Sequence, residues 1–330
     1  MRNISKNWLS ILAFFGVVLV MSCNHSTQPT TKVIENKTSL SDAKKKIIEQ
    51  SVCSHFINEE VTAGEYFDFI DEIVAHYDSI FEYPISEHLI MRHNPWAIDS
   101  LINTDYYLLS EQGKFVYDPQ SIVIFRPGDS LIIPTEREVE MLTQKMAKTL
   151  IDVNIPEYKL SILESGSPIH ETTVRVGKNT KRFLAMAGRD VDLKTRPGYG
   201  EIVRIARDPA FINPRNNKRY SVTKRDDGKV TKMPRIPWIE PEINGTRYGQ
   251  LIHPTTNLKT LGKAYSNGCV GTSEADAWRL YFYAPLGTKV QFRYDLEVAT
   301  AQGDTTQLKD IYPGFTRRWE RIKAKKEKDS

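Results

Sequence analysis

The chain has 330 residues, of which 40% are hydrophobic and 10% aromatic, a composition that excludes the disordered, collagen-like and coiled-coil classes. It carries 45 basic and 41 acidic residues, a net charge of +4, and the surplus lies in residues 317–330, which we expect to form a solvated helix or a frayed tail. The rest of the chain sums to zero and gives no sign of a basic patch, so we expect no nucleic-acid partner.

The N-terminus is typical of an exported protein. Arg2 and Lys6 precede an uncharged run at 8–21, which is too short to cross a hydrocarbon core of ~30 Å. A basic region followed by a short apolar region instead indicates a secretory signal. The run ends in Val-Met-Ser-Cys and resembles a bacterial lipobox, which implies that Cys23 is lipidated and holds the chain to a membrane. Asn24, which is not aspartate, favours a periplasm-facing anchor in the outer membrane of a diderm bacterium. An uncleaved anchor and soluble secretion remain the alternatives.

Composition shifts divide the rest of the chain. A polar stretch without apolar periodicity follows Cys23 and predicts a flexible tether. Helical spacing of apolar residues comes next, and alternating strand patterns follow from about residue 149. The predicted parts are a signal peptide at 1–22, a lipidated tether at 23–42, a mainly helical N-terminal domain at 43–148, a mostly β domain at 149–295 and a C-terminal extension with a basic tail at 296–330.

In the N-terminal domain the apolar spacing predicts helices at 43–56, 65–81 and 86–102, the last interrupted at Pro95. The segment 122–134 changes period and predicts a strand, a Pro-Gly turn and a second strand. Its Arg-Pro-Gly-Asp-Ser-Leu-Ile-Ile-Pro ending resembles the close of a LysM carbohydrate-binding module, over barely ten residues. The alternative is a small mixed domain that packs on the next one.

The mostly β domain has short strand patterns at 150–155, 158–164, 169–176, 202–206 and 248–253. The polar stretch 213–227 predicts a long loop. Ser273 begins a capping box and a helix that continues to residue 283, and 287–292 reads as a closing strand. We therefore predict an α+β protein whose larger domain is mostly β, without regular βαβ alternation.

Several common chemistries are absent from the sequence. There is no P-loop, no complete dinucleotide fingerprint, no His-Glu-x-x-His zinc motif and no Gly-x-Ser-x-Gly elbow. Glu240 and Glu242 could form a carboxylate pair, but the prolines beside them favour a surface loop.

One combination of residues does suit catalysis. His253 precedes Cys269 by a loop, and a cysteine needs a nearby base because its free pKa is about 8.5. Gly268 lacks a Cβ, which lets backbone N–H groups point into one concavity, where they could hold an oxyanion. Taken by itself, the pattern leaves open a buried inert thiol and a hydrogen-bonded core histidine.

At these residues the sequence resembles the L,D-transpeptidase catalytic domain, the YkuD fold, over about residues 149–293. The family pattern runs from a histidine through a loop to Ser/Thr-His-Gly-Cys, then a helix with Asp-Ala and a Gly-Thr-x-Val strand. Upstream, residues 194–197 resemble the family's Thr-Pro segment. Asn267 stands where the family usually has a second histidine, and Gly271 where it usually has Arg or Asn, which leaves substrate preference open. The matching positions are His253, Ser266, Gly268, Cys269, Val270, Asp276, Ala277, Gly287, Thr288 and Val290.

The resemblance implies a β-sandwich-like domain acting on peptidoglycan stem peptides, without metal or other cofactor. It assigns attack on the carbonyl to Cys269, proton transfer to His253, and oxyanion binding to the backbone N–H groups of Gly268 and Cys269. An acceptor amine would then resolve the thioester into a 3-3 crosslink after release of D-alanine. The other expected substrate-binding residues are Tyr248, Ser266 and Asn267 in the pocket, with Arg247 and Lys263 on stem-peptide carboxylates.

The resemblance also bears on the other cysteine. An even pair in an exported chain suggests a disulfide between Cys53 and Cys269, but this would remove the nucleophile. We therefore expect Cys53 to be a small buried hydrophobe on the first helix. Separately, we expect the protein to be a monomer. Two alternative functions stay open: an L,D-carboxypeptidase, in which water replaces the amine, and a catalytically silent lipoprotein that binds the cell wall.

Overall fold

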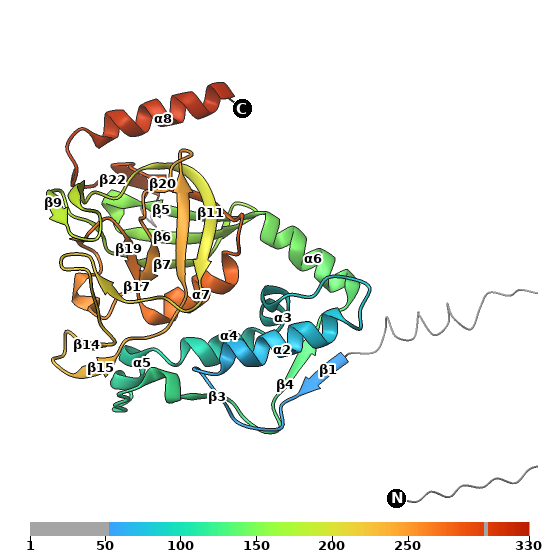
Figure 1. Ribbon diagram of the computed structural model, residues 1–330. Helices are drawn as coiled ribbons and strands as arrows, with labels where there is room; N and C mark the ends of the chain where they lie inside the picture. Colours follow the sequence, from blue (N-terminus) through green and yellow to red (C-terminus); the bar gives the residue numbers. More distant parts are fainter. Residues whose placement is uncertain (1–52, 300–302, 330) are drawn as a thin grey trace, which may run out of the picture. The chain divides into compact units, whose positions relative to one another are not determined.

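The computed structural model describes residues 53–299 and 303–329 (Figure 1). The predicted signal peptide, the tether with Cys23 and most of the helix predicted at 43–56 lie outside these residues. Within the described ranges, no helix is long and apolar enough to pass through a membrane.

The region before residue 149 is mainly helical, as predicted, with short strands between the helices. The helix α2 covers most of the span predicted at 65–81, and Pro95 separates α3 from α4 because proline is accepted in the first helical turn. Thr135 and Glu138 form a capping box that begins α6. The elements are β1 (Cys53–Phe56), β2 (Val61–Thr62), α2 (Tyr66–Asp78), α3 (Glu87–His93), α4 (Pro95–Ile102), α5 (Tyr106–Glu111), η1 (Pro119–Ser121), β3 (Val123–Phe125), β4 (Ser130–Ile133) and α6 (Glu136–Ala147).

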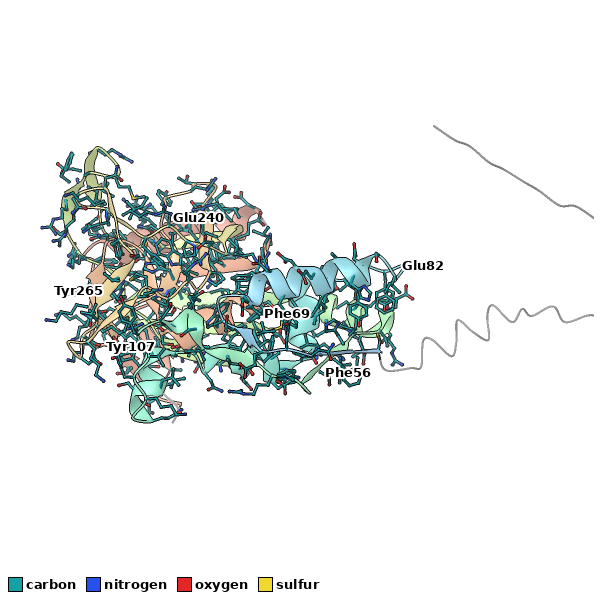
Figure 2. All side chains as sticks on the ribbon, turned by 60° about the horizontal axis from the view of Figure 1, so that its bottom comes forward. Phe56, Phe69, Glu82, Tyr107, Glu240 and Tyr265 are labelled. Carbon is teal, nitrogen blue, oxygen red and sulfur yellow. The ribbon has the colours of Figure 1, made fainter. Side chains whose placement is uncertain are left out.

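The prediction that Cys53 lies on a helix is wrong. Cys53 begins β1, which pairs antiparallel with β4, so that Cys53 lies opposite Ile133. The apolar spacing of the first segment suits a helix, but pairing with a distant strand decides its conformation. Phe56, at the end of β1, is exposed (Figure 2), whereas Cys53 is partly buried against the apolar core of this region. Cys53 and Cys269 are both free thiols, as expected.

An eight-stranded sheet forms the centre of the mostly β region and confirms the α+β prediction (Figure 1). Its order is β19-β17-β16-β11-β20-β5-β6-β7, and neighbours are antiparallel except for the pairs β17–β19 and β20–β5. Its strands are β5 (Thr149–Asn154), β6 (Lys159–Glu164), β7 (Ser167–Thr173), β11 (Gly198–Ala206), β16 (Trp238–Ile243), β17 (Ile252–Pro254), β19 (Val270–Thr272) and β20 (Lys289–Arg293).

The helix α7 (Glu274–Tyr283) is shared by two apolar cores. Trp278 and Phe282 pack with the helices before residue 149, whereas Leu280 packs with the strands of the central sheet. Ser273 caps the helix, as predicted, by accepting a hydrogen bond from the backbone N–H of Asp276. Since this helix directly follows β19, the end of the sheet that holds Cys269 is attached to the helical region.

The long loop predicted at 213–227 contains short hairpins, and residue 225 in its second hairpin is buried. Glu240 and Glu242 do not lie in a surface loop either: they belong to β16, where pairing with β11 on one side buries Glu240. The remaining elements are η2 (Ile155–Glu157), β8 (Val176–Gly177), β9 (Lys181–Leu184), β10 (Arg189–Asp192), β12 (Ile212–Asn213), β13 (Lys218–Arg219), β14 (Val222–Lys224), β15 (Val230–Lys232), η3 (Leu258–Thr260), β18 (Ala264–Ser266), β21 (Glu297–Ala299), β22 (Thr305–Gln307) and α8 (Phe315–Asp329).

The C-terminal helix α8 is helical as predicted, but it is more than a solvated tail. Trp319 is 1% exposed and packs with the core of the sheet. Its indole N–H donates to a carboxylate oxygen of Asp295 at 2.6 Å. A single buried indole in a highly charged helix therefore fixes α8 to the domain.

Candidate active site

Parallel pairing of β17 with β19 brings the two predicted catalytic residues to neighbouring chain segments. Ile252 lies opposite Val270, and His253 lies opposite Gly271. Cys269 directly precedes β19, and its backbone neighbour Val270 donates an N–H to the carbonyl oxygen of Leu251. The register of one strand pair thus determines that the thiol and the imidazole belong to the same end of the sheet.

The turn before Cys269 is held by side chains on both sides. Gly268 has a φ of +113°, and a Cβ there would lie 2.8 Å from Nε2 of Gln250, so only glycine fits without a shift. The hydroxyl of Ser266 donates to the Cys269 carbonyl at 2.6 Å, and the hydroxyl of Thr195 donates to the Gly268 carbonyl at 3.0 Å. This turn is therefore fixed before any ligand arrives.

The Cys269 thiol is half-buried and accepts a hydrogen bond from the backbone N–H of Leu251, with a distance of 3.4 Å from nitrogen to Sγ. Burial raises the pKa of this thiol above its ordinary value, while the Leu251 N–H and the Arg175 guanidinium act in the opposite direction. The resting sulfur is consequently a thiol that has charge-stabilising groups close by.

His253 is oriented by its own strand. Nδ1 lies 2.9 Å from the carbonyl oxygen of Pro254, which can only accept, so Nδ1 carries the proton and Nε2 is free to take one. The imidazole contacts Trp238, with 5.0 Å between ring centroids. Burial, with help from the positive charge of Arg175, lowers the pKa of His253 to about 4. The imidazole is therefore neutral at pH 7, as a general base must be.

One of the two predicted oxyanion donors, the Gly268 N–H, already has a hydrogen-bond partner in the structure. The N–H of Gly268 donates to Oγ of Ser266 at 3.1 Å. An oxyanion would have to compete with this hydroxyl for the Gly268 N–H. The assignment of both donors remains a prediction.

The comparison with protein families decides which kind of domain carries this site. Residues 148–292 match the model of YkuD, the L,D-transpeptidase catalytic domain. This match confirms the resemblance that the sequence predicted at almost the same boundaries. No curated protein matches the chain.

Solved L,D-transpeptidases resemble the chain at low identity. The enzyme from Xylanimonas cellulosilytica is 15% identical with a TM-score of 0.32, over 74% of this chain and all of the other. An enzyme from Mycobacterium smegmatis is 12% identical with a TM-score of 0.31, over 44% of this chain and 59% of the other. The catalytic domain from E. faecium is 19% identical with a TM-score of 0.28, over 44% of this chain and 97% of that domain.

The YkuD segment, residues 148–292, contains every predicted site residue except Cys23, but the structure does not gather them all at the thiol. Arg247 forms an ion pair with the buried Glu240 of β16, at 2.7 Å (Figure 2 labels Glu240). Tyr248 is exposed under the guanidinium of Arg196, 5.7 Å from the ring centroid. Lys263 is exposed and Asn267 half-buried. Their roles in binding substrate remain predictions.

Three residues beside the thiol and the imidazole escaped sequence reasoning: Arg175, Trp238 and Gln250. No local motif marks them: Arg175 and Trp238 lie on other segments of the chain, and Gln250, three residues before His253, reaches the site through its contact with the Gly268 turn. Trp238 also contacts Phe211, with 5.6 Å between centroids, and Phe211 lines an open hollow of about 700 Å³. The imidazole is thereby linked through two aromatic rings to a hollow large enough for a peptide side chain.

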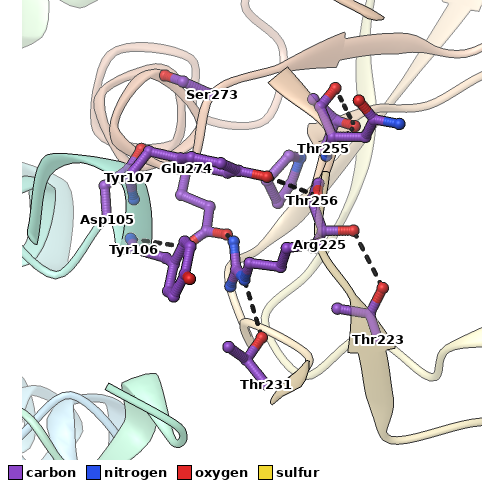
Figure 3. A network of polar contacts seen from close by, with 12 residues as sticks. Asp105, Tyr106, Tyr107, Thr223, Arg225, Thr231, Thr255, Thr256, Ser273 and Glu274 are labelled. Atoms are coloured by element: carbon purple, nitrogen blue, oxygen red, sulfur yellow. Dashed lines mark hydrogen bonds and ion pairs between the residues drawn. The ribbon is translucent and has the colours of Figure 1, made fainter. Parts of the chain in front are cut away.

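A buried polar network in the YkuD segment ties it to the helical region (Figure 3). Arg225 and Glu274 form an ion pair whose side chains are 0% and 1% exposed. Glu274 accepts the N–H of Tyr106 in α5, and the Tyr107 hydroxyl donates to the carbonyl of Thr256, just after β17. The helical region therefore braces the segment that follows His253.

In residues 53–299 and 303–329, no group of three or more His, Cys, Asp or Glu side chains is placed to hold a metal ion.

Proposed function

We propose that this protein is a peptidoglycan L,D-transpeptidase that uses Cys269 as its nucleophile. The observation that carries the proposal is the parallel register of β17 and β19, which places the base-bearing strand beside the cysteine turn within a segment that matches the YkuD model. A neutral imidazole with a free Nε2 and a thiol that ends a fixed turn suit nucleophilic acyl transfer.

In the proposed reaction, Nε2 of His253 takes the thiol proton as Sγ bonds to the carbonyl carbon of a stem peptide. The carbon–nitrogen bond to D-alanine breaks, and the same proton passes to the leaving amine. A side-chain amine of a second stem peptide then attacks the thioester, which restores the thiol and forms the 3-3 crosslink. General acid–base assistance of this kind is worth about 10²–10⁴ in rate.

The proposal extends to location. Lipidation of Cys23 would hold the enzyme at the periplasmic face of a membrane, within reach of the cell wall. The basic region and short apolar run before Cys23 support export.

The test incubates the purified chain with disaccharide-tetrapeptides and follows the products by mass spectrometry, with the Cys269→Ala variant alongside. We expect dimers with a 3-3 link from the wild type and none from the variant. Tripeptides without dimers would instead identify an L,D-carboxypeptidase. Unchanged substrate, together with equal retention of both proteins on isolated cell wall, would favour the silent wall-binding lipoprotein.

A further inference from the structure

Arg175 lies between β7 and β8, and its backbone is fixed against the strand that follows Cys269. Its N–H donates to the Gly271 carbonyl and its carbonyl accepts the Gly271 N–H, both at 2.9 Å. The next two residues pair with β18, so that Val176 lies opposite Ala264 and Gly177 opposite Ser266. The chain at Arg175 thus runs beside both strands that flank the cysteine turn.

The side chain of Arg175 occupies the space that a side chain at position 271 would need. A Cβ built on Gly271 would lie 2.5 Å from Nε, 2.8 Å from Cγ and 3.0 Å from Cδ of Arg175. These are atoms in the middle of the arginine side chain, so any larger residue at 271 would force the whole side chain to move. The absence of a side chain at Gly271 therefore leaves room for the Arg175 side chain at the site.

Within the described part of the chain, the guanidinium of Arg175 has no acidic partner. Nη1 donates to the Thr260 hydroxyl at 3.3 Å, Nε is buried without a hydrogen-bond acceptor, and no ion pair with a carboxylate is found among the described residues. The titratable groups that face it are Cys269, His253, Tyr220 and Tyr265. The side chain is half-buried, and shielding Nε from solvent without an acceptor is costly, so its position beside a thiol calls for a functional reason.

We propose that Arg175 is a positioning residue for the nucleophile: its guanidinium, admitted by Gly271, supplies the positive charge that stabilises the Cys269 thiolate. This inference rests on the proposed function only in taking Cys269 as the nucleophile. When Nε2 of His253 removes the proton from Sγ, the sulfur gains a negative charge opposite Arg175. The same positive charge destabilises the protonated imidazole of His253. This favours transfer of the proton from His253 to the leaving amine.

The test measures alkylation of Cys269 by iodoacetamide between pH 5 and 10 in the full chain. Mass spectrometry of the peptide that contains Cys269 separates its labelling from that of Cys23 and Cys53. Iodoacetamide needs neither peptidoglycan nor the oxyanion donors, so the result stands whether or not the proposed function does. His253, Tyr220 and Tyr265 are the titrating neighbours, and they are unchanged in every variant used.

We expect Arg175→Gln to raise the apparent pKa of the thiol by about one unit and to slow alkylation at pH 7.5 by about tenfold. Arg175→Lys keeps the charge and should recover most of the rate. Gly271→Ala keeps the arginine but displaces its side chain, and should slow alkylation as well. Arg204→Gln removes a half-exposed arginine of β11 that pairs with Glu240 of β16. It is the matched control and should follow the wild type.

A profile of Arg175→Gln that superimposes on the wild type would overturn the proposal. So would loss of transpeptidation in this variant with an unchanged thiol profile, since Arg175 would then act elsewhere. If Arg175→Gln fails to fold, the Lys and Gly271→Ala variants decide: equal slowing in both contradicts a role for the charge. A shifted thiol pKa in a protein without action on disaccharide-tetrapeptides would leave the inference intact and remove the proposed function.

Discussion

Two arginines in the same segment, the buried Arg225 and the half-buried Arg175, have opposite surroundings. Arg225 is paired with Glu274, donates from Nε to the Thr231 hydroxyl at 2.8 Å and lies 4.0 Å above the ring centroid of Tyr106 (Figure 3). Among the residues that the structure describes, the Arg175 side chain has one long hydrogen bond, to Thr260, and no carboxylate partner. The Arg225 side chain is removed from water and compensated by a carboxylate, whereas that of Arg175 is half-buried, with its Nε shielded from solvent.

The difference indicates a structural role for Arg225 and a role in the reaction for Arg175. A buried cation with an acidic partner and a ring holds elements together, since breaking the pair leaves an uncompensated charge. A half-buried cation without such a partner has its field available for a charge that appears during a reaction. We therefore assign Arg225 to holding the helical region against the sheet domain, and Arg175 to stabilising the Cys269 thiolate.

The largest expected effect is on stability, from Arg225→Met. This change leaves Glu274 buried without its partner, and we expect the free energy of unfolding to fall by about 3–5 kcal/mol. Alkylation of Cys269 in the folded variant should follow the wild type. Urea unfolding measures the first quantity. The double variant Arg225→Met/Glu274→Leu, which removes both charges, should recover much of the loss; an equal loss in both would show that the ion pair is not the cause.

Arg175→Met should increase the stability of the protein, in contrast to Arg225→Met. It removes a buried Nε that has no acceptor while keeping a side chain of similar length, so we expect the free energy of unfolding to rise by about 1–2 kcal/mol. The same urea experiment gives this value. A fall as large as that of Arg225→Met would mean that Arg175 also serves to hold the fold together.

The smallest effect concerns pH. The pKa of His253, about 4, lies below that of the unfolded chain, which takes up a proton first as the pH falls. The contribution of His253 to stability is thus complete above pH ~6.5 and is lost as the pH falls towards 4. Because Arg175 helps to lower this pKa, Arg175→Met should move it upward by less than about one unit and reduce the loss. NMR titration of the imidazole measures the shift, and Arg225→Met is the control that should leave it unchanged.

Sequence reasoning predicted the parts of the site that are local. The glycine-cysteine turn, the capped helix after it and the histidine at a strand end all leave short patterns, and the structure places them together. Arg175 could not be predicted, because it reaches Gly271 only through an isolated antiparallel bridge between distant segments.

The same reason explains the errors outside the site. Local spacing predicts a helix at Cys53, but pairing with β4 makes its segment a strand. Residue 225 lies in a polar stretch that indicates a loop, yet its charge is buried because Glu274 and Tyr106 meet it from elsewhere in the chain. Trp319 is buried in a helix whose sequence is otherwise that of a solvated tail.

The close contact between Gly271 and the side chain of Arg175 constrains how the two positions can evolve. A larger residue at 271 is harmful while the arginine remains, and a small residue at 175 leaves a gap that glycine at 271 cannot fill. Relatives descended from a common ancestor should therefore differ at the two positions together. Exchange of a charged side chain between them would pass through an intermediate in which both are small.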